Sequence, residues 1–79
     1  MRLKQLGPNQ AELITNHEYR ILYSYETPVA GYSPLIGWFK VNKKYSVTTT
    51  RHINKYLGDI SAVALSPETI EQMGQHIGD

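Results

Sequence analysis

Turn-forming residues recur at short intervals through the first half of this 79-residue chain, and their spacing limits what the chain can fold into. Gly7-Pro8-Asn9-Gln10 favours a turn, because proline presets one turn position and asparagine tolerates the next. Ser33-Pro34-Leu35-Ile36-Gly37 reads as an apolar loop, and Asn42-Lys43-Lys44 turns the chain again. Short runs joined by such turns predict an antiparallel β-meander of about five strands rather than β-α-β units.

The clearest strand covers residues 19–25, where aromatic and β-branched side chains are enriched. At period two, one face carries Tyr19, Ile21, Tyr23 and Tyr25, and the other carries Arg20, Leu22 and Ser24. We expect the remaining strands at 2–6, 11–15, 29–32, 37–41 and 45–48. Thr27-Pro28 should interrupt pairing before residue 29, because proline cannot donate a ladder hydrogen bond.

The second half changes character and predicts two helices, which makes the fold α+β. The first covers about residues 49–57, with Thr49 or Thr50 as the N-cap and Gly58 as a left-handed C-terminal cap. Its apolar stripe follows helical spacing and consists of Ile53, Tyr56 and Leu57. The apolar run 61–65 fits either a strand or a loop.

The second helix covers about residues 67–77. Ser66 is its expected N-cap, and Pro67 is tolerated at the first helical position. Ile70, Met73 and Ile77 should form its buried face. With both helices, the chain is expected to be a single domain over residues 1–79.

Composition narrows the classes of protein further. The absence of cysteine excludes disulfides and thiolate zinc sites, and His17, His52 and His76 lack ligand spacing, so we expect neither metal nor cofactor. A domain this small buries only about 60% of its unfolded surface, and self-association is the remaining aid, so a homo-oligomer is expected. No signal-peptide core and no run of about 20 apolar residues is present, which predicts a cytoplasmic protein without a membrane span.

Charge is unevenly distributed, although the net charge is only +1. Residues 40–55 carry six basic side chains, counting His52, and no acidic one. Residues 58–79 carry four acidic side chains and no lysine or arginine. This asymmetry is the compositional feature that bears on partners.

Aromatic side chains lie among the basic ones, which is the mixture that single-strand nucleic-acid binders use. The candidate residues for contact with nucleic acid or another partner are Trp38, Lys40, Lys43, Lys44, Tyr45, Arg51 and Lys55. A second interpretation stays open. The six tyrosines would supply a thin core and an interface, and the lysines would guard exposed strands against edge pairing.

Three blocks of sequence resemble those of a known family. They are Ser24-Tyr25-Glu26-Thr27-Pro28-Val29-Ala30, Lys43-Lys44-Tyr45-Ser46-Val47-Thr48-Thr49 and His52-Ile53-Asn54-Lys55-Tyr56-Leu57. Together they are similar to the SYxTPVA, aromatic-Ser-x-Thr-Thr and HINxWL blocks of a family of short uncharacterised proteins from phages, archaea and marine environmental sequences. The resemblance covers residues 9–57, although Tyr45 and Tyr56 stand where tryptophan is usual and 31–36 looks inserted. It implies a small phage-type accessory protein and no particular chemistry.

Three functional hypotheses follow. The first is a binding or interaction module with an unknown protein partner, and the alternative is a nucleic-acid-binding accessory factor that uses the basic residues 40–55. The third is a small enzyme whose site forms between subunits. No catalytic residue is predicted for it, because the serines sit in no nucleophile elbow and no glycine-rich loop precedes a helix. His52 could act as a base, but its place in a short helix favours a packing role.

Overall fold

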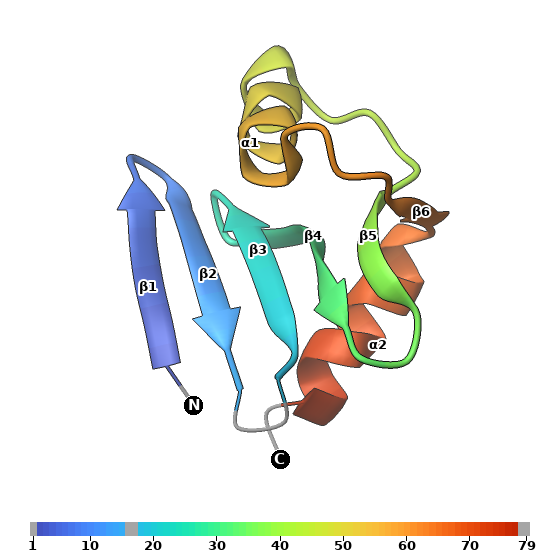
Figure 1. The fold of residues 1–79 in the computed structure, drawn as a ribbon. Coiled ribbons are helices and arrows are strands. Elements are labelled where there is room, and N and C mark those ends of the chain that lie inside the picture. Colours follow the sequence, from blue (N-terminus) through green and yellow to red (C-terminus); the bar gives the residue numbers. More distant parts are fainter. Residues whose placement is uncertain (1, 16–17, 78–79) are drawn as a thin grey trace.

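The first five strands lie next to one another in the sheet in the order of the chain, because the connections between them are too short to cross it. The computed structural model describes residues 2–15 and 18–77, and its elements are drawn in Figure 1. They are β1 (Arg2–Gly7), β2 (Gln10–Ile14), β3 (Arg20–Ser24), β4 (Thr27–Ser33), β5 (Gly37–Val41), α1 (Val47–Leu57), β6 (Val63–Leu65) and α2 (Pro67–Ile77). The sheet order is β1-β2-β3-β4-β5-β6, and β1 to β5 form an antiparallel meander, so the predicted α+β fold is confirmed.

Turns with positive φ set the ends of several strands. Asn9 has a φ of 60° between β1 and β2, as the turn signal indicated. Tyr25 and Glu26 have φ values of 61° and 134° between β3 and β4. The predicted strand 19–25 therefore ends at Ser24, and Tyr25 leaves the face that it was expected to share with Ile21. A positive φ at two residues that are not glycine gives no signal in the sequence.

A β-bulge admits proline into β4. Tyr23 pairs with Pro28 and Leu22 with Ala30, which leaves Val29 as the extra residue. The prediction that proline interrupts pairing here is wrong, because a bulge is one of the places where a sheet tolerates it. Val29 and Ala30 are consequently both fully buried, although they are neighbours in a strand.

The last strand departs from the meander. β6 pairs with β5 in parallel, and α1 lies between them in the chain. The sequence favoured a meander over β-α-β units, and this prediction is wrong for the last strand. β5, α1 and β6 form one such unit, because the crossover through α1 returns the chain to the free edge of β5. The run 61–65, open between strand and loop, therefore pairs over Val63–Leu65. The Leu65 carbonyl also accepts a hydrogen bond from the Asn42 amide at 2.8 Å.

α1 begins two residues earlier than predicted. Ser46 is its N-cap, and the Ser46 Oγ accepts a hydrogen bond from the Thr49 amide at 3.1 Å. The Thr50 hydroxyl donates to the Ser46 carbonyl at 3.0 Å. The expected strand 45–48 is therefore absent, because this cap fixes the start of the helix at Val47.

Gly58 ends α1 with φ 59° and ψ −124°. The positive φ that the sequence predicted is confirmed, but ψ is not that of a left-handed helix. The Gly58 amide donates to the Asn54 carbonyl at 2.8 Å, and the Ile60 amide donates to the Leu57 carbonyl at 3.0 Å. Those dihedral angles belong to the first central residue of a type II′ turn, a position that glycine dominates.

The two helices lie against opposite faces of the sheet (Figure 1). α1 packs on β3 and α2 on β4, where Ile70 is fully buried and Met73 packs against the core. Ser66 caps α2 as predicted, because its Oγ accepts from the Thr69 amide at 3.2 Å. The buried core consists of Ile21, Leu22, Val29, Ala30, Phe39, Val41 and Ile70. The side chains of Ile77 and His76, and residue His17, lie outside the described part of the chain.

Candidate functional site

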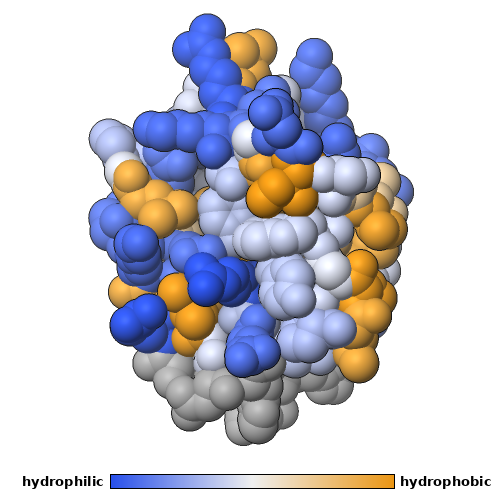
Figure 2. Space-filling view, in the orientation of Figure 1, coloured by the Kyte–Doolittle hydropathy of each residue, from blue (hydrophilic) through white to orange (hydrophobic). Residues whose placement is uncertain are grey.

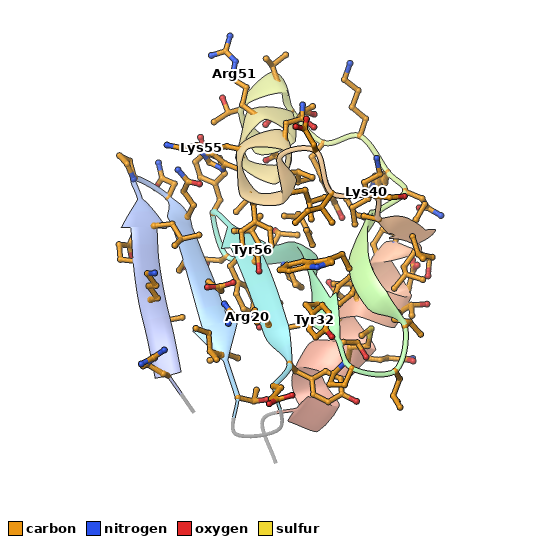
Figure 3. All side chains as sticks on the ribbon, in the orientation of Figure 1. Arg20, Tyr32, Lys40, Arg51, Lys55 and Tyr56 are labelled. Carbon is orange, nitrogen blue, oxygen red and sulfur yellow. The ribbon has the colours of Figure 1, made fainter. Side chains whose placement is uncertain are left out.

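The predicted basic residues divide between two surfaces. Lys40 on β5 and Lys43 and Lys44 beyond it line a groove of about 460 Å³ between the end of β5 and α1. Arg51 and Lys55 do not line it, and Figure 3 shows them at the outer side of α1, away from Lys40. We call this surface the lysine groove, which is lined by Lys40, Val41, Asn42, Lys43, Lys44, Thr50, Ile53, Asn54 and Ala64. The structure thus brings three of the five predicted cations together and separates the other two.

Among the described residues, no carboxylate is recorded in an ion pair with a lysine of the lysine groove. None of its lining residues is acidic. In the part of the chain that the structure describes, the ion pair recorded joins Arg20 to Glu12 on a different part of the sheet. The three ammonium groups of the groove are therefore free to meet the negative charge of a partner.

Tyr45 lies beside the lysine groove and is 40% exposed. The Lys43 Nζ sits 5.3 Å from the centroid of the Tyr45 ring, which is a cation–π distance. Tyr45 therefore combines an exposed aromatic surface with an adjacent positive charge, as the sequence predicted for this segment.

Trp38 belongs to an aromatic cluster instead, which we define as Tyr32, Trp38 and Tyr56. The Trp38 ring centroid lies 5.0 Å from that of Tyr32 and 5.9 Å from that of Tyr56. In Figure 3, Tyr56 points from α1 toward the sheet, with Tyr32 below it, and Figure 2 shows pale, weakly polar surface in the middle of this face. Two rings pack against Trp38, which is half-buried and offers less free surface for stacking on a base than the exposed Tyr45.

A buried carboxylate lies next to this cluster, and the sequence did not reveal it. Glu12 is 5% exposed, accepts a hydrogen bond from the Tyr56 hydroxyl, and has Arg20 Nη1 at 3.7 Å from its Oε2. Burial raises the pKa of Tyr56, the hydrogen bond to Glu12 and its charge raise it further, and Arg20 opposes the rise. These partners satisfy Glu12, so the group stabilises the fold rather than offering an acid or a base.

Ser24 and His52 form a second buried polar group, at the contact between β3 and α1. The Ser24 Oγ lies 2.7 Å from His52 Nδ1 and 3.1 Å from the Thr49 hydroxyl. Ser24 is 1% exposed, and the Tyr25 ring lies 5.9 Å from the His52 ring. His52 lines neither the lysine groove nor the depression beside Trp38. A serine beside a histidine resembles a nucleophile and its base, but this serine has no surface that a substrate could reach.

The same contact unites the three sequence blocks that resemble a family. Ser24 and Tyr25 come from the first block, Ser46 and Thr49 from the second, and His52 from the third. The Ser46 hydroxyl donates to the Thr49 Oγ1 at 3.2 Å, which extends the network to the helix cap. The blocks therefore coincide with the residues that attach α1 to the sheet.

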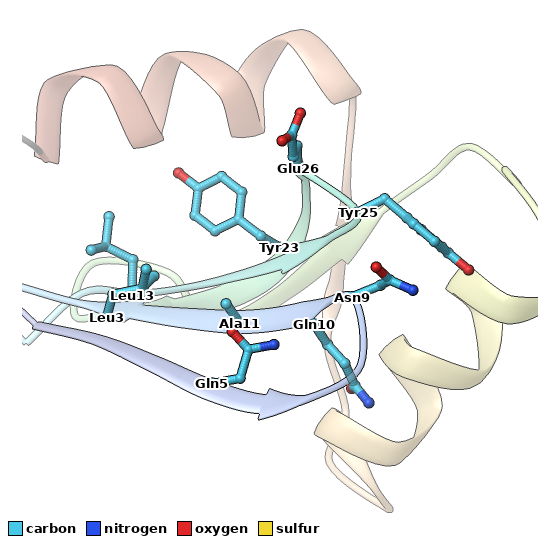
Figure 4. A pocket seen from close by; sticks show the side chains of 9 residues that line it. All are labelled: Leu3, Gln5, Asn9, Gln10, Ala11, Leu13, Tyr23, Tyr25 and Glu26. Carbon is cyan, nitrogen blue, oxygen red and sulfur yellow. The ribbon is translucent and has the colours of Figure 1, made fainter.

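A further depression, of about 570 Å³, lies over β1 to β3, on the same side of the sheet as α2 but beyond the part that α2 covers. Leu3, Ala11, Leu13 and Tyr23 form its apolar part, and Leu3 is 66% exposed. Figure 4 shows Tyr23 and Glu26 on the side of the sheet that faces α2. Burial raises the pKa of Tyr23. None of the candidate contact residues lines this depression.

Two structural features limit the kinds of site that the described residues could form. α1 and α2 have 11 residues each, and no helix of the described part has the length and apolar character to cross a membrane. No three His, Cys, Asp or Glu side chains gather there as metal ligands.

Comparison with known proteins bears on family membership. No curated protein and no solved structure matches the chain. A family model, described as a family of unknown function (DUF8033), matches residues 1–72. That match runs from β1 into α2, and the chain therefore belongs to the family of unknown function DUF8033.

Proposed function

We propose that this chain is a small accessory protein of the phage type that works as a binding module and not as a catalyst. The observation that supports this proposal is the hydrogen bonding of its buried polar side chains. In the described part of the chain every buried side-chain nitrogen and oxygen has a hydrogen-bond partner, including Ser24, His52 and Glu12. Catalytic groups must instead reach a substrate from a cleft. The resemblance of the three blocks to short phage proteins supports the accessory role.

The lysine groove is the contact surface in this proposal. Three lysines line it with no acidic residue among the other lining residues, and Ile53 and Ala64 supply apolar contact. Positive charge of this kind raises the association rate of an anionic partner. It also orients the partner on the surface. An acidic segment of another protein fits that description.

Nucleic acid is the second candidate partner, and Tyr45 favours it. An exposed ring next to Lys43 and Lys44 offers both a stacking surface for a base and charges for the adjoining phosphates. If three lysines neutralise phosphates on a single strand, the logarithm of affinity should fall against that of salt with a slope of about −2. Arg51 and Lys55 lie on another surface and should add little.

Fluorescence anisotropy tests the proposal, with labelled single-stranded DNA, double-stranded DNA and a glutamate-rich peptide at two salt concentrations. The informative variant is Lys43→Glu with Lys44→Glu. Arg51→Glu with Lys55→Glu is the matched control, because it makes the same change in net charge away from the groove.

We expect the Lys43/Lys44 variant to abolish salt-sensitive binding and the control to retain most of it. Binding of oligonucleotides and not of the peptide would select the nucleic-acid candidate, and the reverse would select a protein partner. Absence of binding to all three ligands at low salt, or an equal loss in both variants, would contradict the groove as the contact surface.

A further inference from the structure

A groove of different chemistry lies between the β4–β5 loop and α2. It encloses about 460 Å³, and the residues that matter here are Leu35, Ile36, Leu65, Thr69, Gln72 and Met73. None of the residues that line it is charged. We call it the apolar groove. The other three depressions each contain charged residues, which are Glu26 in one, Glu18 and Arg20 in the second, and lysines in the third.

The β4–β5 loop carries two apolar side chains at the rim of the apolar groove. Leu35 is 83% exposed and Ile36 is 46% exposed. The Leu35 amide donates to the Ser33 hydroxyl at 3.2 Å, and Ser33 is 2% exposed. Gly37 closes the loop with a φ of 85°, and it pairs with Ser33 across the hairpin. These contacts constrain the loop backbone, so less backbone entropy is lost when Leu35 and Ile36 are buried on binding.

We propose that a second copy of this chain covers the apolar groove, with Leu35 of each copy entering the groove of the other. In a twofold interface the same patch serves both partners, so a protruding side chain beside a cavity of matching chemistry is complementary to itself. The uncharged lining supports this occupant, because any charge near the axis would meet an identical charge. The lysine groove could not face its own copy for that reason.

A stable dimer needs more contact surface than the apolar groove alone supplies. A standard interface covers about 800 Å² on each partner, which is about one sixth of the 5136 Å² that the chain exposes. Val63 is 50% exposed and lies two residues before Leu65 on β6, so the apolar surface continues along that strand. A domain of this size also gains stability from such an association.

Sedimentation equilibrium on the full chain, over low to high micromolar concentration, tests the inference. Leu35→Asp removes the protruding apolar side chain, and Gln72→Lys places a charge in the groove at an exposed helical position. Val47→Asp is the matched control, because Val47 is 61% exposed and lies at the start of α1. Circular dichroism should show that all three variants keep the fold, since the substituted side chains are exposed.

We expect the parent chain and Val47→Asp to approach twice the 9.0 kDa monomer mass at high concentration. Leu35→Asp and Gln72→Lys should each raise the dimer dissociation constant at least about tenfold, as loss of a central contact does. A parent chain that stays monomeric would overturn the inference, and so would a dimer that neither groove variant weakens. Because the lysine groove is not involved, this result is independent of the anisotropy titrations.

Discussion

The hydrogen bond between Tyr56 and Glu12 provides the sharpest test of what holds α1 on the sheet. Glu12 is 5% exposed and has two polar partners there, the Tyr56 hydroxyl and Arg20. Tyr56→Phe removes one of them and leaves the ring. A hydrogen bond to a buried charged group contributes about 1.5–3 kcal/mol to the free energy of unfolding. When the bond is lost, the desolvation penalty of the carboxylate is no longer offset by that partner. We therefore expect the free energy of unfolding to fall by about 2 kcal/mol.

Substitution of Arg20 tests whether the Tyr56 hydroxyl or the ion pair with Arg20 contributes more to the stability of buried Glu12. Its Nη1 lies 3.7 Å from Glu12 Oε2, and 46% of its side chain is exposed, so water screens the pair. Exposed ion pairs contribute about 0–1 kcal/mol, and Arg20→Gln should therefore destabilise less than Tyr56→Phe. Glu12→Gln combined with Tyr56→Phe should cost less than the sum of the single changes, because the buried charge is then gone.

Urea denaturation followed by circular dichroism measures these differences. Circular dichroism is preferable to fluorescence, because the single tryptophan packs 5.9 Å from the Tyr56 ring and would report the substitution itself. In thermal unfolding, each kcal/mol corresponds to about 4–8 °C for a domain of this size. A loss below about 0.5 kcal/mol in Tyr56→Phe, or a larger loss in Arg20→Gln, would refute the assignment of the main effect to the hydroxyl.

Three further predictions concern stability. Gly58→Ala and Gly58→Asn should each cost about 1–3 kcal/mol in chemical denaturation, because a ψ of −124° lies outside the left-handed region that asparagine tolerates; a mild Gly58→Asn would indicate a left-handed cap instead. Ser24→Ala should lower the free energy of unfolding by about 1–3 kcal/mol, since it leaves buried His52 without its 2.7 Å partner, and an unchanged denaturation midpoint would count against that role. The folded-state pKa values of Tyr56 and Tyr23 are raised above 10.0, so the unfolded chain loses protons first and stability should fall as pH rises above about 10. That fall should be shallower in Tyr56→Phe, and equal slopes in a pH series of melting curves would exclude Tyr56 as a cause.

Signals that act within a few residues predicted their elements well. Ser66 and Pro67 mark the start of α2, and the predicted range 67–77 is the observed one. The strand 37–41 likewise matches, because its flanking turns are explicit in the sequence. The start of α1 was missed because Ser46, Thr49 and Thr50 are all capping residues. Packing of α1 on the sheet selects Ser46 as the cap. The Thr49 hydroxyl is used in the hydrogen bond with Ser24, and the Thr49 amide donates to Ser46.

Features that depend on distant partners could not be read from the sequence. β6 has three residues and exists because β5 lies beside it, so its own composition cannot specify it. Glu12 lies inside the predicted strand 11–15, but its burial depends on the pairing register and on the placement of Tyr56, which the sequence does not show.

The spatial grouping of the candidate contact residues also depends on how distant parts of the chain are arranged. Lys40, Lys43 and Lys44 lie close together because they are close in sequence, whereas Arg51 and Lys55 were counted with them only by proximity along the chain. A helix carries residues four apart on one side, and that side of α1 faces away from the groove.

The unlike edges of the sheet have a consequence for solubility. β6 exposes an edge of only three residues, so a foreign strand would gain few hydrogen bonds there. β1 exposes an edge of six, but Arg2 and Lys4 lie along it, and a strand added in register would bring its own copy of these charges against them. Neither edge therefore favours fibre growth, and concentrated solutions of the folded chain should remain free of amyloid-type aggregates.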